Sequence, residues 1–314
     1  MLRSTLLPKL ARSLTTTTTT TTAAARRHLT SSTPLFSMAS STLPAFKTPE
    51  SFASVAESDY TPKLHLYTAP TPNGYKPSIL LEELHAAYPE SKELVYDYSY
   101  LSFKDNDQKK PEFLKINPNG RIPALVDDNY TVAGKDGGHK VWESASILLW
   151  LVERYDKENK FWFDKPEEKS DALSWIFFAH GGVGPMQGQA NHFFRYAPEK
   201  IPYGIKRYQD ETARLYSVLE DRLSDPSSGG FLVGGKFSVA DINVYPWVKI
   251  HAWSGVETTP FPAVEKWLET IGARPAVQLG LKTPQGSAPK SKEEEEKIAK
   301  DARSWIVPGK QEEK

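Results

Sequence analysis

Apolar and polar residues alternate along parts of the first half of the chain, with a period typical of half-buried strands. Strands are predicted at 63–69, 93–100, 122–128 and 140–144. Between and after them the apolar residues follow a helical period, which predicts helices at 78–87, 111–120 and 144–155. The order strand, helix, strand, helix, strand, strand, helix predicts an α+β unit with a small mixed sheet.

The strand pattern stops after Lys165, and four segments with helical spacing follow, at 168–195, 204–223, 238–253 and 261–272. Ser238 and Asp241 form an S-x-x-D pair, which is typical of a helix start, so Asp241 is predicted to be a folding residue. We therefore predict an α+β domain at 63–160, an all-helical domain at 161–283 and a charged tail at 284–314. A surface helix is possible in that tail, because four apolar residues have helical spacing: Ile298, Ala302, Trp305 and Ile306.

The first 62 residues are predicted to lie outside the core, as a leader at 1–37 and a Ser/Pro-rich linker at 38–62. Residues 1–49 contain six Lys or Arg and no acid, and the chain begins with leucines four residues apart among basic residues. This pattern is typical of a mitochondrial transit peptide. A low-complexity tail without a targeting role is the alternative. Met38 is a second plausible start, so a cytosolic form without the leader is conceivable.

The 314 residues carry 39 Lys or Arg and 39 Asp or Glu, and this balance argues against a general nucleic-acid binder. The chain has no cysteine, which excludes disulfide scaffolds, thiolate zinc sites, iron–sulfur clusters and a cysteine nucleophile. The seven histidines show no metal-binding spacing, so no metal is expected. The longest strongly apolar run, at 147–152, is far shorter than the ~20 residues that span a bilayer, so no membrane insertion is expected.

Three features carry candidate chemistry. Glu143 and Ser144 stand at the start of a predicted helix, where unpaired backbone N–H groups attract anions; an ordinary helix cap is the alternative. Pro123 opens a strand, where it removes a ladder donor. The segment 71–77 (TPNGYKP) is predicted to be a loop, in which Asn73 is either a plain turn residue or a hydrogen-bond donor to a ligand.

Four motifs in this order and spacing resemble the cytosolic glutathione transferases over about residues 63–283: TPNG (71–74), NPNGRIPALVDD (117–128), WESASILLWL (142–151) and SVADINVYPW (238–247). The segment 184–209 narrows the resemblance to the bacterial Nu class and the related fungal branch that contains the nitrogen-catabolite regulator. The resemblance implies a thioredoxin-like domain followed by an all-α domain, usually in a homodimer. It also implies glutathione as substrate or cosubstrate.

The resemblance assigns residues to each part of glutathione. Glu143 and Ser144 are expected to bind the γ-glutamyl group. A cis bond between Ile122 and Pro123 is expected to turn the Ile122 backbone toward the cysteinyl backbone. Gln108 is expected at the glycyl end, with charge from Arg121 or from Lys109 and Lys110. Arg207 matches an arginine that reaches the active site from the helical domain in the bacterial enzymes.

The sulfur contact is expected in the segment 71–77. In the branch that the chain resembles, the Asn73 amide is the expected donor to the glutathione sulfur, with Thr71 as a second donor. Tyr75 remains open as the donor instead. A donor and a helix N-terminus favour thiolate over thiol and so lower the thiol pKa. Weaker candidates for the wall that binds the second substrate are His180, Met186, Asn191 and His192.

The resemblance thus implies an enzyme that activates the glutathione thiol for attack on an electrophile, a peroxide or a disulfide. Disulfide reduction is plausible, and because the chain has no cysteine, such a cycle must use glutathione sulfurs alone. A non-enzymatic glutathione-binding regulator or interaction module of the same fold is the alternative. Turnover distinguishes the two, because a binding module holds glutathione without a saturable rate.

Overall fold

The computed structural model describes residues 42–52, 60–134, 137–284 and 292–306. The predicted leader at 1–37 and the second start at Met38 lie outside the described residues. Among these residues, no helix combines the length and apolarity needed to cross a bilayer.

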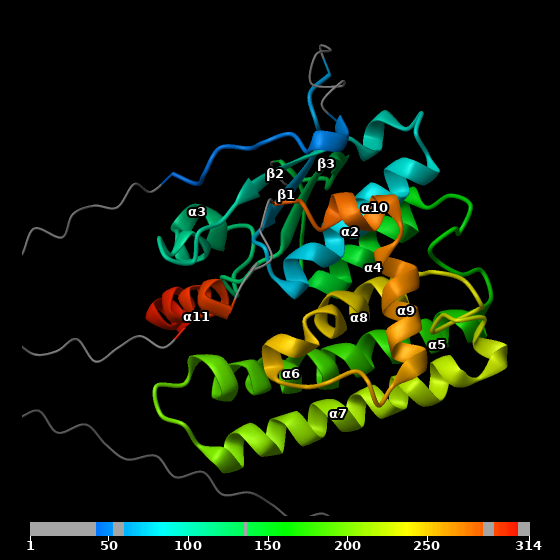
Figure 1. The fold of residues 1–314 in the computed structure, drawn as a ribbon. Helices are drawn as coiled ribbons and strands as arrows, with labels where there is room; N and C mark the ends of the chain where they lie inside the picture. Colours follow the sequence, from blue (N-terminus) through cyan, green and yellow to red (C-terminus); the bar gives the residue numbers. More distant parts are fainter. Residues whose placement is uncertain (1–41, 53–59, 135–136, 285–291, 307–314) are drawn as a thin grey trace, which may run out of the picture. The chain divides into compact units, whose positions relative to one another are not determined.

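The first domain is built on a four-stranded mixed sheet in the order β2-β1-β3-β4 (Figure 1). Parallel pairing joins β1 (Leu64–Thr68) to β2 (Tyr96–Tyr100), and antiparallel pairing joins β1 to β3 (Ala124–Thr131) and β3 to β4 (Gly138–Trp142). The helices are α2 (Pro72–Ala87), the short α3 (Pro111–Leu114) and α4 (Ser144–Tyr155). This confirms the predicted α+β unit and its mixed sheet.

The first helix begins earlier than the sequence predicts. The segment 71–77, predicted to be a loop, forms the first turns of α2. Pro72 occupies the start of the helix, where its missing N–H costs nothing and its fixed φ fits. Thr71 caps this turn, because its Oγ1 accepts a hydrogen bond from the Gly74 backbone N at 3.1 Å. A Cβ at Gly74 would lie 2.0 Å from the Ala69 carbonyl oxygen, so the glycine lets the helix approach the end of β1.

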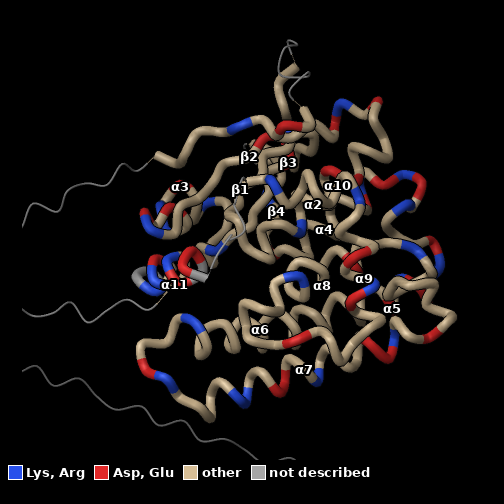
Figure 2. Tube along the Cα trace, viewed as in Figure 1, with Lys and Arg blue, Asp and Glu red and all other residues tan. Residues whose placement is uncertain are grey.

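The second domain is all-helical, as predicted, and its first predicted helix is interrupted. It contains α5 (Pro166–Phe178), α6 (Gly184–Asn191), α7 (Pro202–Ser224), α8 (Val239–Lys249), α9 (Pro262–Gly272) and α10 (Pro275–Gly280). Two π-helical turns, η4 (Ala179–Val183) and η5 (His192–Tyr196), flank α6. The glycines and proline around 181–185 thus shift the helix register without ending the helical path. Figure 2 shows Lys and Arg interspersed with Asp and Glu along α7.

Helix α2 is fixed between the two domains and makes extensive contacts with α4, α8 and α10. Ser78 Oγ donates to the Gly280 carbonyl at 2.8 Å, and a Cβ at Gly280 would lie 2.5 Å from Ile79 Cα. Arg274 and the buried Glu83 form a bidentate ion pair at 2.6 and 2.7 Å. The middle and the C-terminal half of α2 are therefore tied to the second domain.

Asp241, at the start of α8, is completely buried and accepts four hydrogen bonds. The donors are the Leu232 backbone N (3.1 Å), Ser238 backbone N (3.0 Å), Ser238 Oγ (3.2 Å) and Trp267 Nε1 (2.9 Å). Ser238 and Asp241 form the capping box that their spacing predicts. The contacts agree with a folding role for Asp241, since they tie the start of α8 to α9.

Part of the predicted linker packs onto the first domain instead of lying outside the core. Lys47 forms an antiparallel bridge with Tyr98 on the edge strand β2, and Phe52 is completely buried. Ser99 Oγ donates to the Pro44 carbonyl at 2.8 Å. The sequence did not predict this packing, because a single bridging residue and a single buried ring leave no periodic pattern in a Ser/Pro-rich segment.

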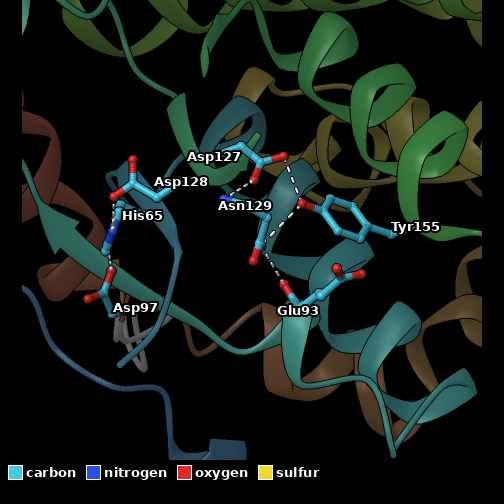
Figure 3. Close-up of polar contacts among 7 residues, drawn as sticks. All are labelled: His65, Glu93, Asp97, Asp127, Asp128, Asn129 and Tyr155. Carbon is cyan, nitrogen blue, oxygen red and sulfur yellow. Dashed lines mark hydrogen bonds and ion pairs between the residues drawn. The ribbon is translucent and has the colours of Figure 1, made fainter. Parts of the chain in front are cut away.

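Two polar clusters lie side by side in the sheet, near the start of β1 (Figure 3). On β1, His65 lies between two acids, with Nδ1 2.7 Å from Asp97 Oδ1 and Nε2 3.2 Å from Asp128 Oδ2. The neighbouring Asp127 is completely buried and accepts from Tyr155 Oη (2.7 Å), Trp150 Nε1 (2.9 Å) and Asn129 N (3.0 Å). These contacts join β1, β2 and β3 to one another and β3 to α4.

The helix considered possible in the tail is present as α11 (Lys292–Ile306). Its Ala299 and Ala302 are buried, and the helix packs against η5 of the second domain. Arg303 Nη2 donates to the Arg195 carbonyl at 3.0 Å. The helix is therefore docked on the protein by its small residues and not only exposed at the surface.

Candidate active site

A cleft of about 590 Å³ lies between the two domains, next to the first turn of α2 and the start of α4. Seven of the nine site residues predicted from the sequence line it: Thr71, Asn73, Arg121, Ile122, Pro123, Glu143 and Ser144. Among the four candidates for the second-substrate wall, His180 lines the cleft. The structure does not bring Gln108 or Arg207 to it. Gln108 is half-buried beside the turn at Gly120, and Arg207 is exposed on α7.

The amide of Asn73 is oriented by the second domain. Trp247 Nε1 on α8 donates to Asn73 Oδ1 at 3.0 Å. An indole N–H can only donate, so the atom facing Trp247 must be the amide oxygen, and the Asn73 Nδ2 group faces away from it. Gly184 lies against the indole, where a Cβ would be 3.1 Å from Nε1. The structure therefore presents Asn73 as a fixed donor on the cleft wall.

The two other candidate donors, Thr71 and Tyr75, have different roles at the start of α2. Thr71 uses its hydroxyl oxygen to cap α2, which leaves the hydroxyl hydrogen able to donate. Tyr75 is not among the residues that line the cleft and packs against the hydrophobic core. Burial raises the pKa of Tyr75 to about 12. This placement favours Asn73 over Tyr75 as the donor.

Glu143 and Ser144 form the start of α4, but Glu143 does not act as an ordinary helix cap. Its side chain makes no cap hydrogen bond, it is exposed, and its φ of 70° is rare for a residue with a side chain. Ser144 is buried, with Oγ 3.5 Å from His180 Nε2. The strained backbone thus positions a carboxylate and a hydroxyl at the same helix N-terminus.

A tight turn at residues 117–123 forms another part of the cleft wall. The Ile122–Pro123 bond is cis, as predicted, and the ladder of β3 begins only at Ala124. Asn117 is almost completely buried and organises the turn: its Nδ2 donates to the Arg121 carbonyl at 2.6 Å, and its Oδ1 accepts from Asn119 N at 3.0 Å. Ile122 is therefore left outside the sheet, with Arg121 beside it.

Two further basic side chains, Lys76 and His180, line the cleft. Lys76 is only 2 % exposed, and burial lowers its pKa to about 7, while the Glu143 charge acts in the opposite direction. Burial also lowers the pKa of His180 to about 4, and the positive charge of Lys76 adds to this effect. His180 is therefore neutral near pH 7, whereas Lys76 is close to its own midpoint.

Comparison with known proteins identifies the family. The glutathione S-transferase N-terminal domain matches residues 62–153, and the C-terminal domain matches residues 203–275. The disulfide-bond oxidoreductase YfcG of Escherichia coli is 41 % identical over 220 residues, which covers 69 % of this chain and 94 % of YfcG. The chain belongs to the glutathione S-transferase family.

Other family members with similar sequences have different described roles. The transcriptional regulator URE2 of Saccharomyces cerevisiae is 33 % identical over 67 % of this chain and 65 % of its own length. A solved glutathione transferase homologue from Lodderomyces elongisporus, with two glutathione molecules per subunit, matches with a TM-score of 0.65. It is 39 % identical and covers 72 % of this chain and 100 % of its own. URE2P6 from Phanerochaete chrysosporium, solved with oxidised glutathione, has a TM-score of 0.63 at 38 % identity. The match covers 72 % of this chain and 98 % of URE2P6.

Three residues of this glutathione S-transferase cleft were missed in the sequence. Trp247 belongs to a recognised motif, but its partner Asn73 is 174 residues away. Lys76 follows Asn73 by three residues and so shares its helix face, which is the one signal that could have indicated it. Asn117 opens the motif at 117–128, but its contacts with Arg121 and Asn119 arise only in the folded turn. Within the described residues, no group of three or more His, Asp or Glu could hold a metal ion.

Proposed function

We propose that the chain is a glutathione-dependent enzyme that stabilises the glutathione thiolate and directs it at an electrophile, a peroxide or a disulfide. The observation that carries this proposal is the Trp247–Asn73 hydrogen bond, which leaves the Asn73 Nδ2 group as a preoriented donor in the cleft. A donor fixed beforehand stabilises developing negative charge without reorganising during the reaction. The N-terminus of α2 acts in the same direction.

The other cleft residues support a single orientation of glutathione. Glu143 and Ser144 suit the γ-glutamyl group, and the Ile122 backbone, which lies outside the ladder, suits the cysteinyl backbone. With these two anchors, the cysteinyl sulfur is directed toward Thr71 and Asn73. Arg121 supplies a positive charge beside Ile122 for the glycyl carboxylate. Gln108 and Arg207 have no part in this proposal.

Within this proposal, disulfide reduction is the favoured reaction, which the 41 % identity to a disulfide-bond oxidoreductase supports. The bound thiolate attacks one sulfur of the disulfide, the S–S bond breaks, and the leaving thiolate takes up a proton. A second glutathione thiolate then attacks the mixed disulfide, which releases oxidised glutathione and the second thiol. Both attacking sulfurs come from glutathione, because the chain has no cysteine.

A glutathione-binding regulator without turnover is the second candidate, and the similarity to URE2 favours it. The two candidates share the γ-glutamyl and cysteinyl anchors and differ at the sulfur. A regulator needs no oriented donor at Asn73. The Trp247–Asn73 contact therefore favours the enzyme, and a saturable rate with a disulfide, a peroxide or an aryl halide distinguishes the two.

The Asn73→Ala variant tests the proposed chemistry. Loss of the donor is expected to raise the pKa of the bound thiol and to lower kcat/KM by roughly 10- to 100-fold, the range for a hydrogen bond to a charged group. Glutathione affinity, measured by calorimetry, is expected to change much less, because the other anchors remain. A pH–rate profile is expected to show the acidic limb moved to higher pH.

Two matched variants sharpen this test. Tyr75→Phe removes the alternative hydroxyl and is expected to leave the rate unchanged. Trp247→Phe removes the indole donor that orients the amide, and a several-fold loss of rate with normal glutathione affinity is expected. A wild-type rate and an unshifted pH profile in Asn73→Ala would exclude Asn73 as the donor.

We also propose that the protein is a homodimer. Support comes from large apolar side chains that remain exposed on neighbouring strands, Tyr130 on β3 and Trp142 on β4, and from Phe177 on α5, which is 68 % exposed. Such residues on one subunit suit a second copy of the chain. Light scattering after size-exclusion chromatography is expected to give twice the mass of one chain, and a monomer mass would contradict the proposal.

For the leader we propose mitochondrial import, with a cytosolic form beginning at Met38. The support is the acid-free, basic composition of residues 1–49. A fluorescent fusion of residues 1–60 is expected to enter mitochondria. A diffuse cytosolic signal would contradict import.

A further inference from the structure

Lys76 is a buried charge in the cleft that no part of the proposed chemistry uses. It lines the cleft at the first turns of α2 and is 98 % removed from solvent. Among the residues that the structure describes, its Nζ has neither a hydrogen-bond nor an ion-pair partner. Buried lysines are rare unless they are paired, because desolvating an unpaired ammonium is costly. A lysine kept in this position indicates a partner that arrives with a ligand.

The groups around Lys76 define what such a ligand must carry. Glu143, at the start of α4, is the acid that acts on Lys76 through space, and His180, on η4, is the basic group affected by it. From α8, Trp247 faces the cleft, and Arg274 before α10 is occupied by Glu83. Ser144 Oγ lies beside His180. One carboxylate, one ammonium and one hydroxyl therefore meet at the N-terminus of α4.

The charges of this site are complementary to those of an α-amino acid, which carries an ammonium and a carboxylate group. An α-ammonium group fits Glu143, which is exposed and free of any capping bond. An α-carboxylate fits Ser144 and the first turn of α4, and it needs a cation within reach. Lys76 is the cation whose charge interacts with Glu143 at this helix start, whereas Arg121 belongs to the turn at Ile122.

We propose that Lys76 binds the free α-carboxylate of the γ-glutamyl group and that the protein takes up a proton at Lys76 when the ligand binds. This inference rests on the proposed glutathione site and adds its charge recognition. In the empty cleft, burial holds the pKa of Lys76 near 7, so part of the population is neutral. A bound carboxylate favours the ammonium form and raises that pKa, which draws a proton from solution. The site then selects ligands with a free α-carboxylate.

Calorimetry with S-hexylglutathione tests this coupling, because this probe has no titrating thiol. Titrations at about pH 7.5 in two buffers with different ionisation enthalpies measure the proton uptake directly. Wild type is expected to take up a substantial fraction of one proton. Lys76→Met is expected to take up none and to bind roughly 10- to 100-fold more weakly near pH 6.

The pH dependence gives a second readout. Between about pH 7 and 8.5, wild-type affinity is expected to fall toward tenfold per pH unit, since binding must then supply the missing proton. Lys76→Met is expected to lack this additional slope. Lys206→Met, a change of an exposed lysine on α7, is the matched control and is expected to behave as wild type. Lys76→Arg keeps the charge but cannot titrate, so it is expected to bind without proton uptake.

Other results would contradict either the role of Lys76 or the glutathione site itself. If proton uptake persists in Lys76→Met and disappears in His180→Gln, the titrating group is His180 and the proposal is wrong. Equal binding of a probe with an amidated α-carboxylate would also overturn it. If wild type does not bind S-hexylglutathione at all, the proposed glutathione site fails instead. Should Lys76→Met not fold, Lys76→Arg still decides whether the proton is taken up at residue 76.

Discussion

Asp241 and Lys76 are both charged side chains removed from solvent, one at the start of α8 in the helical domain and one on the cleft wall. Asp241 accepts four hydrogen bonds from its own chain, whereas Lys76 has no hydrogen-bond or ion-pair partner among the described residues. Burial raises the pKa of Asp241 to about 6 and lowers that of Lys76 to about 7. In both cases burial disfavours the charged form. Only for Asp241 do hydrogen bonds stabilise the charged form and so oppose the effect of burial.

The difference separates a charge that holds the fold from one that is available to a ligand. A buried carboxylate with all its partners in place specifies one arrangement of α8, α9 and the loop at Leu232. A buried ammonium without partners does not stabilise the empty protein. It is retained at the cost of stability, which is expected at functional sites. The number of internal partners is therefore a better guide to function than burial alone.

The largest effect is expected from Asp241→Ala. The substitution leaves Trp267 Nε1 and two backbone N–H groups buried without an acceptor, and breaking such a network typically costs about 3–5 kcal/mol. Denaturant unfolding is expected to show a loss of this size. Asp241→Asn keeps one acceptor and is expected to lose less. Full stability in Asp241→Ala would remove the distinction between the two charges.

Lys76→Met is expected to have the opposite effect on the ligand-free protein. Replacing an unpaired buried charge by an apolar side chain of similar length should stabilise it, by about 1–4 kcal/mol by analogy with buried ion pairs. The pKa of Lys76 is lower in the folded protein than in the unfolded chain, so the unfolded state binds the extra proton between pH 7 and 10. Wild type should therefore gain stability relative to the variant as pH rises through this range. Thermal unfolding of both proteins at several pH values measures the difference.

The same contrast explains what could be predicted from the sequence. Strand alternation and helical spacing depend on neighbouring residues, and they predicted the mixed sheet and the all-helical domain. The capping box at Ser238 and Asp241 is also local, and its spacing was sufficient. The segment 71–77 was misread because Pro72 and Gly74 resemble loop residues, whereas in α2 they form a helix start that approaches β1.

The cleft was predicted only where its residues belong to local motifs. Thr71, Asn73, Ile122, Pro123, Glu143 and Ser144 all line it, and all lie in such motifs. The burial of Lys76 and the contact of Trp247 with Asn73 depend on how the two domains pack, and no local pattern contains that information. Arg207 shows the reverse: a motif match placed it at the site, and the packing leaves it exposed on α7.

His65 provides the smallest and last test, because it lies between the two extremes. It is partly buried on β1, with Asp97 and Asp128 on its two ring nitrogens (Figure 3). Burial lowers the pKa of His65, but the hydrogen bonds and charges of the two acids outweigh this and raise the pKa above its ordinary value. Like Asp241 it has internal partners, so its charge should stabilise the fold.

Because the folded-state pKa of His65 is the higher one, its contribution is complete below about pH 6.5 and is lost as pH rises through the folded-state pKa. The expected loss is about 1 kcal/mol, the upper end for ion pairs that are not fully buried. His65→Phe keeps the ring contact with Phe46, at 5.0 Å between centroids, and cannot titrate. The stability difference between wild type and His65→Phe should therefore shrink as pH rises from 6 to 9. A difference that is constant over this range would show that His65 contributes by packing and not by charge.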